Sequence, residues 1–141
     1  MMMKRYNQKI VYAISILILA VFLGLVFYNT KKEMFVSNCG TLTYYYSPGC
    51  GYCKEFSPIW TGDSSDSNSL QYAINNASPP VNVTLAIVDI SDPANSSIVN
   101  TKKISGVPTI ILTPNTGSDI TFNDDRTPAK IVAFIQTNCS K

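Results

Sequence analysis

The stretch CGYC, from Cys50 to Cys53, decides how the rest of this chain is interpreted. Before it, the β-branched and aromatic run of residues 41–46 is typical of a strand. After it, residues 54–60 are typical of the start of a helix. Two thiols three residues apart at such a junction predict redox chemistry. The N-terminus of a helix carries a partial positive charge and unpaired N–H groups, and both stabilise a thiolate.

Hydrophobic patterns and turn residues divide the rest of the chain into alternating elements. Strands are expected at 42–46, 81–90, 109–113 and 118–122, and the second of these is expected to be buried. Helices are expected from near Cys50, disturbed at Pro58, at 70–77, irregularly at 93–103, and after Thr127-Pro128. Aromatic residues at 44–46 and 60 are expected in the core or on the sheet. This order predicts an α/β fold with a mixed β-sheet flanked by helices.

An uncharged apolar run, IVYAISILILAVFLGLVFY, occupies residues 10–28. At about 1.5 Å per residue its length is close to the roughly 30 Å hydrocarbon core of a bilayer, which predicts a transmembrane helix. A buried core helix and a cleaved signal peptide are the alternatives. The run is longer than a typical signal-peptide core and no clear small-residue cleavage site ends it, which favours a signal anchor.

Basic residues flank this run on both sides, three before it and two after it (Lys4, Arg5, Lys9, Lys31 and Lys32). The excess on the first side favours the N-terminus in the cytoplasm and the domain on the non-cytoplasmic side. The predicted organisation is a tail at 1–9, a transmembrane helix at 10–28, a linker at 29–38 and a globular domain at 39–141. Residues 10–28 would contact membrane lipid.

The charge of the chain from residue 33 onward excludes one class of partner. Five of the 11 basic residues precede residue 33, so the remainder carries six basic residues against all nine acidic ones, a formal balance of −3. That part of the chain lacks the basic footprint of a nucleic-acid binder. The sequence also contains no histidine, which excludes Cys–His and Ser–His catalysis and any histidine-ligated metal site.

Three motifs, in this order, resemble the thioredoxin family over roughly Thr41 to Asn138. They are the CGYC pair, Pro58 five residues after the second cysteine, and the segment ISGVPT at 104–109. The last is similar to the family's segment in which a cis-proline opens an antiparallel strand. Residues 122–135 are similar to its last strand and closing helix. The resemblance implies a thioredoxin-like fold.

The resemblance also implies a mechanism. Cys50 would be the exposed attacking thiol with the lower pKa, and Cys53 the buried resolving thiol. Val107 and Pro108 would place backbone beside the disulfide, where it can pair with an extended substrate peptide. The partners would be protein thiols and disulfides, and no metal or organic cofactor is needed.

The chain departs from the family pattern at three positions. Gly49 stands where thioredoxins usually carry a tryptophan, and Tyr44 stands where many members bury an acid that assists proton transfer to the second cysteine. Tyr52, between the cysteines, resembles the tyrosine of the glutaredoxin motif. The first two departures, at Gly49 and Tyr44, argue against fast reductase turnover.

Two further cysteines, Cys39 and Cys139, flank the domain. In a thioredoxin-like fold the first strand begins, and the last helix ends, away from the redox pair, so a structural disulfide between them is geometrically possible. Two free thiols or an unrelated pairing are the alternatives. A zinc site made of all four cysteines would need two closely spaced pairs, and the sequence has one.

Two hypotheses of function follow. The first is a membrane-anchored thiol–disulfide oxidoreductase that acts on protein disulfides near the bilayer. The second is a structural or docking module in a larger membrane-associated assembly. Short, Asn-rich, membrane-anchored thioredoxin-like proteins look similar to those encoded by large DNA viruses, where such a chain could be a minor capsid or virion membrane component.

Overall fold

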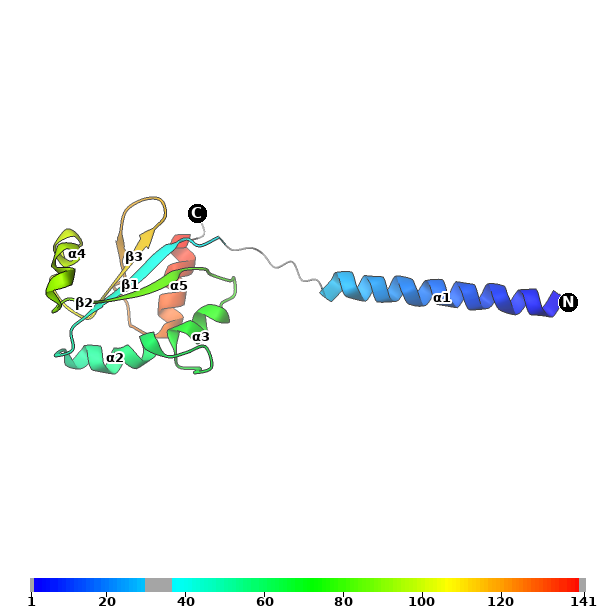
Figure 1. The fold of residues 1–141 in the computed structure, drawn as a ribbon, viewed down its shortest axis with the longest axis horizontal. Helices are drawn as coiled ribbons and strands as arrows, with labels where there is room; N and C mark the ends of the chain where they lie inside the picture. The colour runs from blue at the N-terminus through cyan, green and yellow to red at the C-terminus, as the bar shows by residue number, and fades with distance from the viewer. Residues whose placement is uncertain (1, 30–36, 140–141) are drawn as a thin grey trace. The chain divides into compact units, whose positions relative to one another are not determined.

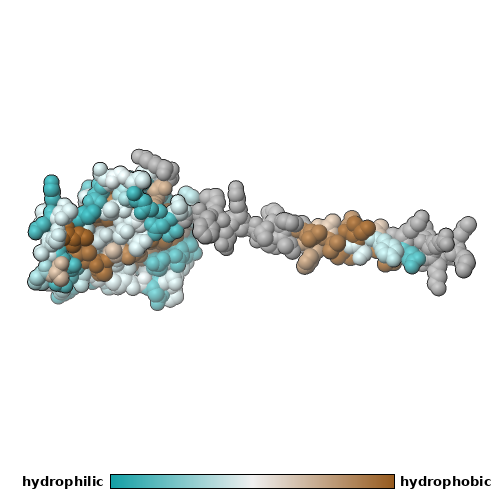
Figure 2. Space-filling model, turned by 45° about the horizontal axis from the view of Figure 1, so that its top comes forward, coloured by the Kyte–Doolittle hydropathy of each residue, from teal (hydrophilic) through white to brown (hydrophobic). Residues whose placement is uncertain are grey.

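The computed structural model describes residues 2–29 and 37–139, and the chain forms two compact units, Met1–Phe35 and Val36–Lys141. The first unit contains helix α1 (Met2–Asn29) (Figure 1). Its described apolar side chains, between Ile10 and Leu23, are exposed, and Figure 2 shows apolar surface along this part of the helix.

No helical stretch is both long and apolar enough to cross a bilayer in the part of the chain whose side chains the structure describes. The predicted span at 10–28 ends in side chains, 24–28, that lie outside the described residues. Most of the predicted linker at 29–38 lies outside them as well. The transmembrane helix and the linker therefore stay predictions.

A mixed sheet forms the centre of the second unit. It consists of β1 (Gly40–Tyr46), β2 (Thr84–Asp89), β3 (Thr109–Pro114) and β4 (Ile120–Thr121), in the order β2-β1-β3-β4. Strand β1 pairs with β2 in parallel and with β3 antiparallel, and β3 pairs with β4 antiparallel. This confirms the predicted mixed sheet.

Helices flank this sheet (Figure 1). They are α2 (Gly51–Thr61), α3 (Leu70–Asn75), α4 (Ser96–Thr101), which follows a 3₁₀ turn η1 (Pro93–Asn95), and α5 (Pro128–Cys139). Pro58 lies inside α2, which continues to Thr61. The Thr127 hydroxyl accepts from the Lys130 N–H at 3.4 Å, as an N-cap residue does. This fits the predicted start of α5 at Thr127-Pro128.

The main core lies between one face of the sheet and helices α2, α3 and α5. Alternate strand residues contribute to it, because successive side chains of a strand point to opposite faces. The fully buried members are Leu42, Tyr44, Leu70, Ile110, Leu112, Ile131 and Ile135, joined by Cys53, Phe56 and Trp60. The opposite face buries Tyr45 and Ile111. The aromatic run before CGYC therefore lies in the core and on the sheet, as predicted, with Tyr44 in the main core, Tyr45 on the opposite face and Tyr46 half-buried.

The expectation of a buried second strand is wrong. Strand β2 is shorter than predicted, and Ile87 at its centre is 46% exposed. In the described part of the chain β2 pairs with β1 alone, so it forms an edge of the sheet. A continuous apolar run is typical of a strand covered on both sides, and it does not reveal where in the sheet the strand will pair.

Candidate active site

Cys50 is the N-cap residue of α2. After β1 ends, a turn closed by the Cys50 N–H and the Ser47 carbonyl, 3.0 Å apart, brings the chain to the helix. Cys50 has an extended backbone, and its Sγ accepts a hydrogen bond from the Cys53 N–H at 3.2 Å. The sulfur thus receives one of the N–H groups that the first turn of a helix leaves unpaired.

Cys53 lies one turn further along α2 and is 1% exposed, whereas Cys50 is half-buried. Both thiols are free. Burial raises the pKa of Cys53, and the hydrogen bond with Cys50 raises it further, while hydrogen bonds from the Ser47 backbone and the Tyr44 hydroxyl lower it. The site therefore combines one accessible sulfur with one that is kept protonated and out of water.

The segment around Pro108 lies against Cys50. The Cys50 thiol donates to the Val107 carbonyl oxygen at 3.6 Å, although the two residues are 57 positions apart, and the Val107–Pro108 peptide bond is cis. The structure thus brings together the four residues named from the sequence. Beside Cys50 it places the backbone carbonyl of Val107, two residues before β3.

Arg126 is a residue of the site that sequence reasoning missed. Its Nη2 donates to the Pro108 carbonyl oxygen at 2.8 Å, and so ties the segment after α4 to the loop before α5. Arg126 follows Asp124 and Asp125 in a polar turn. The sequence has no local signal that separates it from an ordinary surface cation.

The phenol of Tyr44 reaches the site from β1. Its oxygen lies 3.2 Å from the Cys53 carbonyl oxygen and 3.3 Å from Ser57 Oγ. Burial is the main cause that raises the pKa of Tyr44 to about 12. Ser57, which the sequence did not single out, stands one helical turn after Cys53, and that spacing is the signal that could have found it.

Cys39 and Cys139 form a disulfide, with their Cα atoms 5.5 Å apart. It lies at the beginning of β1, whereas the CGYC pair follows the end of that strand. The sequence left open a disulfide between these cysteines, two free thiols or an unrelated pairing, and the structure has the disulfide. In the described ranges, no three histidine, cysteine or acidic side chains come together as a metal site.

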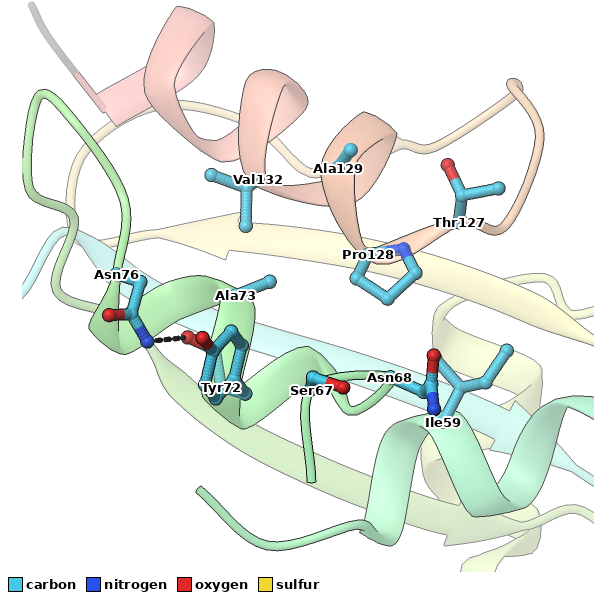
Figure 3. A pocket seen from close by; sticks show the side chains of 10 residues that line it. All are labelled: Ile59, Ser67, Asn68, Tyr72, Ala73, Asn76, Thr127, Pro128, Ala129 and Val132. Carbon is cyan, nitrogen blue, oxygen red and sulfur yellow. Dashed lines mark hydrogen bonds between the residues drawn. The ribbon is translucent and has the colours of Figure 1, made fainter. Parts of the chain in front are cut away.

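A separate pocket of about 550 Å³ lies between α3 and α5 (Figure 3). Ile59 of α2, Ala73 of α3 and Val132 of α5 contribute apolar walls. The two amide side chains at its rim are those of Asn68 and Asn76, and the latter bonds to the Tyr72 carbonyl oxygen at 2.9 Å. None of the residues lining it is a cysteine.

Comparison with known proteins gives matches over most of the chain. The thioredoxin family model matches residues 27–137. Protein disulfide-isomerase of Ricinus communis is 28% identical over 108 residues, which cover 77% of this chain and 19% of that protein. The enzyme of the same name from Datisca glomerata is 28% identical over 113 residues, 80% of this chain and 20% of its own length. The chain thus spans about a fifth of the length of these relatives.

Solved structures show the same fold. The first thioredoxin domain of mouse Protein disulfide-isomerase A4 superposes with a TM-score of 0.57 at 24% identity, over 74% of this chain and 66% of that one. The Trx4 domain of ERdj5 has a TM-score of 0.56 at 19% identity, over 73% and 82% of the two chains.

Proposed function

This chain belongs to the thioredoxin family, and on that premise we propose that it is a thiol–disulfide oxidoreductase acting on protein disulfides through Cys50 and Cys53. One observation carries the proposal. A half-buried sulfur caps the first turn of α2 beside the Val107 carbonyl, and a buried sulfur lies one turn behind it. This is the arrangement that a two-step exchange of disulfides requires.

The order of the two attacks follows from the difference in solvent exposure between Cys50 and Cys53. The Cys50 thiolate attacks one sulfur of a substrate disulfide, a mixed disulfide forms, and the other substrate sulfur leaves as a thiolate that takes up a proton. The Cys53 thiolate then attacks Cys50 Sγ, which forms the Cys50–Cys53 disulfide and releases the remaining substrate sulfur. The substrate gains two electrons, the cysteine pair loses two, and oxidation of a dithiol substrate is the reverse.

The backbone beside Cys50 provides the place where a substrate peptide binds. Val107 and Pro108 precede β3, and an extended peptide that pairs with this backbone would hold its disulfide next to Cys50 Sγ. The bond from Arg126 to the Pro108 carbonyl oxygen would hold this segment in place.

The proposed activity is tested with the full chain and a peptide that contains one disulfide. We expect thiol labelling and mass spectrometry to show exchange, and redox titration to show one two-electron transition of the Cys50–Cys53 pair. A potential near the reducing cytosolic couples would indicate a reductase, and one near the oxidising folding enzymes an oxidase or isomerase. If the protein exchanges no peptide disulfide, the proposed enzymatic activity is contradicted, and the hypothesis of a structural or docking module is favoured.

We further propose that residues 10–28 anchor this activity at a membrane, with the domain on the non-cytoplasmic side. The uncharged run in the sequence and the exposed apolar side chains from Ile10 to Leu23 support the anchor. The excess of basic residues before the run supports the orientation. The substrates would then be proteins whose disulfides lie near the bilayer surface.

The anchor is tested by synthesis of the full chain in the presence of microsomes. We expect the chain to resist alkaline extraction and its domain to be protected from added protease. Leu17→Lys combined with Leu19→Lys should abolish both, because each central lysine costs about 3 kcal/mol on insertion. Leu17→Ile with Leu19→Ile is the matched control, and complete extraction of the unaltered chain would refute the anchor.

A further inference from the structure

Four asparagines of the second unit stand in the tripeptide Asn-x-Ser/Thr, the sequence at which N-glycans are attached. They are Asn76, Asn82, Asn95 and Asn138. A chain rich in Asn, Ser and Thr contains several such tripeptides by chance, so the sequence alone does not rank them. The structure ranks them, because a glycan fits the folded domain only where the asparagine and its surroundings face solvent.

Asn82 lies two residues before β2, on a stretch whose side chains alternate in burial. Val83 and Leu85 pack against the core. Asn82 and Thr84, which alternate with them, are exposed. Successive side chains of an extended chain point to opposite sides, so the amide of Asn82 and the hydroxyl of Thr84 share the solvent side. These are the two groups that define the tripeptide.

The surroundings of Asn82 leave room for a bulky group. In the described part of the chain β2 pairs with β1 alone, so the outer side of β2 is an open edge of the sheet. The Asn82 carbonyl oxygen accepts from the Cys39 N–H at 3.0 Å, which places Asn82 near the beginning of β1. CGYC follows the other end of β1, so a glycan on Asn82 leaves Cys50 accessible to substrate.

The other three asparagines are placed less favourably. Asn95 and Asn138 are half-buried, so a glycan on either would have to displace neighbouring side chains. Asn76 is exposed at the end of α3, but the serine of its tripeptide, Ser78, precedes Pro79. A proline restricts the backbone of the residue before it, which hinders an enzyme that must bind the tripeptide.

We propose that Asn82 carries an N-linked glycan. The inference rests on the proposed orientation, because these glycans are added on the non-cytoplasmic side of a membrane. The donor is a lipid-linked oligosaccharide pyrophosphate. A bond forms between Asn82 Nδ2 and the anomeric carbon of the first sugar, and the bond from that carbon to the pyrophosphate oxygen breaks. The lipid pyrophosphate leaves with the electron pair, and the amide nitrogen gives one proton to the transferring enzyme.

The test is synthesis of the full chain in the presence of microsomes, followed by electrophoresis with and without an endoglycosidase. We expect a slower-migrating form that the endoglycosidase removes, and Asn82→Gln should lose this form. Asn95→Gln is the matched control, because it makes the same change in a half-buried tripeptide, and it should retain the form. A glycosylated form that persists unchanged in Asn82→Gln would overturn the inference.

A second pair of variants leaves Asn82 itself unaltered. Thr84→Val removes the hydroxyl of the tripeptide and keeps the branched shape of the side chain, so the glycan should be lost. Thr84→Ser keeps a hydroxyl at the same position and should keep the glycan. A glycan that remains in Thr84→Val would contradict the assignment.

Added protease separates a failure of this inference from a failure of the proposed orientation. If the domain is protected from protease and bears no glycan, the inference is wrong and the orientation stands. If the domain is digested, it lies on the cytoplasmic side, and the orientation is refuted together with the glycan. A protected domain whose glycan is lost in Asn82→Gln and in Thr84→Val supports both.

Discussion

Cys53→Ser is expected to turn the protein into a trap that holds substrate proteins as stable mixed disulfides on Cys50. Cys50 keeps its place at the N-cap of α2 and its access to solvent, so the first attack proceeds. The buried sulfur that would release the substrate is absent, and a serine hydroxyl does not cleave a disulfide. Non-reducing electrophoresis followed by mass spectrometry should find adducts that reductant removes and that map to Cys50.

Cys50→Ser is the companion variant and should reduce exchange to the uncatalysed rate. Cys53 is 1% exposed, so a protein substrate cannot reach its sulfur once Cys50 is gone. No adduct should form, even though one thiol of the pair is still present. Turnover of a peptide disulfide by Cys50→Ser, or adducts on Cys53, would contradict the assigned order of attack.

Removal of the Cys39–Cys139 disulfide is expected to have the largest effect on stability. Cys39 and Cys139 are separated by 100 positions, and a cross-link that closes a loop of this length restricts the unfolded chain strongly. Cys39→Ser with Cys139→Ser should lower the free energy of unfolding by about 4–5 kcal/mol. This is a large share of the 5–15 kcal/mol typical of a domain, and chemical denaturation followed by circular dichroism measures it.

Disulfide exchange by the Cys50–Cys53 pair serves as the internal control for this experiment. It follows the end of β1, whereas the disulfide lies at the beginning of that strand. The double variant should therefore exchange disulfides at the wild-type rate under conditions where it is folded. An unchanged denaturation midpoint would show that the cross-link does not contribute to stability.

Sequence reasoning succeeded where the signal was local or had a fixed order. The aromatic strand, the CGYC helix start and the Thr127-Pro128 helix start all depend on neighbouring residues, and the structure has each of them. The order of CGYC, Pro58 and Val107-Pro108 along the chain pointed to the family, because members of one fold have their helices and strands in the same order. It did not give the distance between Cys50 and the Val107 carbonyl.

The misses share a physical cause, which is that a sequence does not state which elements become neighbours. The apolar run at β2 has the composition of a central strand, and its exposed Ile87 follows from its place at an edge. Arg126 and Ser57 gain their roles from partners, the Pro108 carbonyl and the Tyr44 hydroxyl, that belong to other elements. Tyr44 was predicted as core and, through the family resemblance, at a position near the second cysteine, and the structure places its hydroxyl 3.2 Å from the Cys53 carbonyl oxygen.

The link between Cys39 and Cys139 also changes what a protease can do to this domain. Residues 39–139 form a covalent ring, so a single cut within it opens the ring and leaves both parts joined through sulfur. The exposed segment at residues 63–68 is the natural place for such a cut, and there the portion that carries CGYC would stay tied to the portion that carries Val107. A protease that has cut the ring once therefore releases separate fragments only after a reductant has broken the Cys39–Cys139 disulfide.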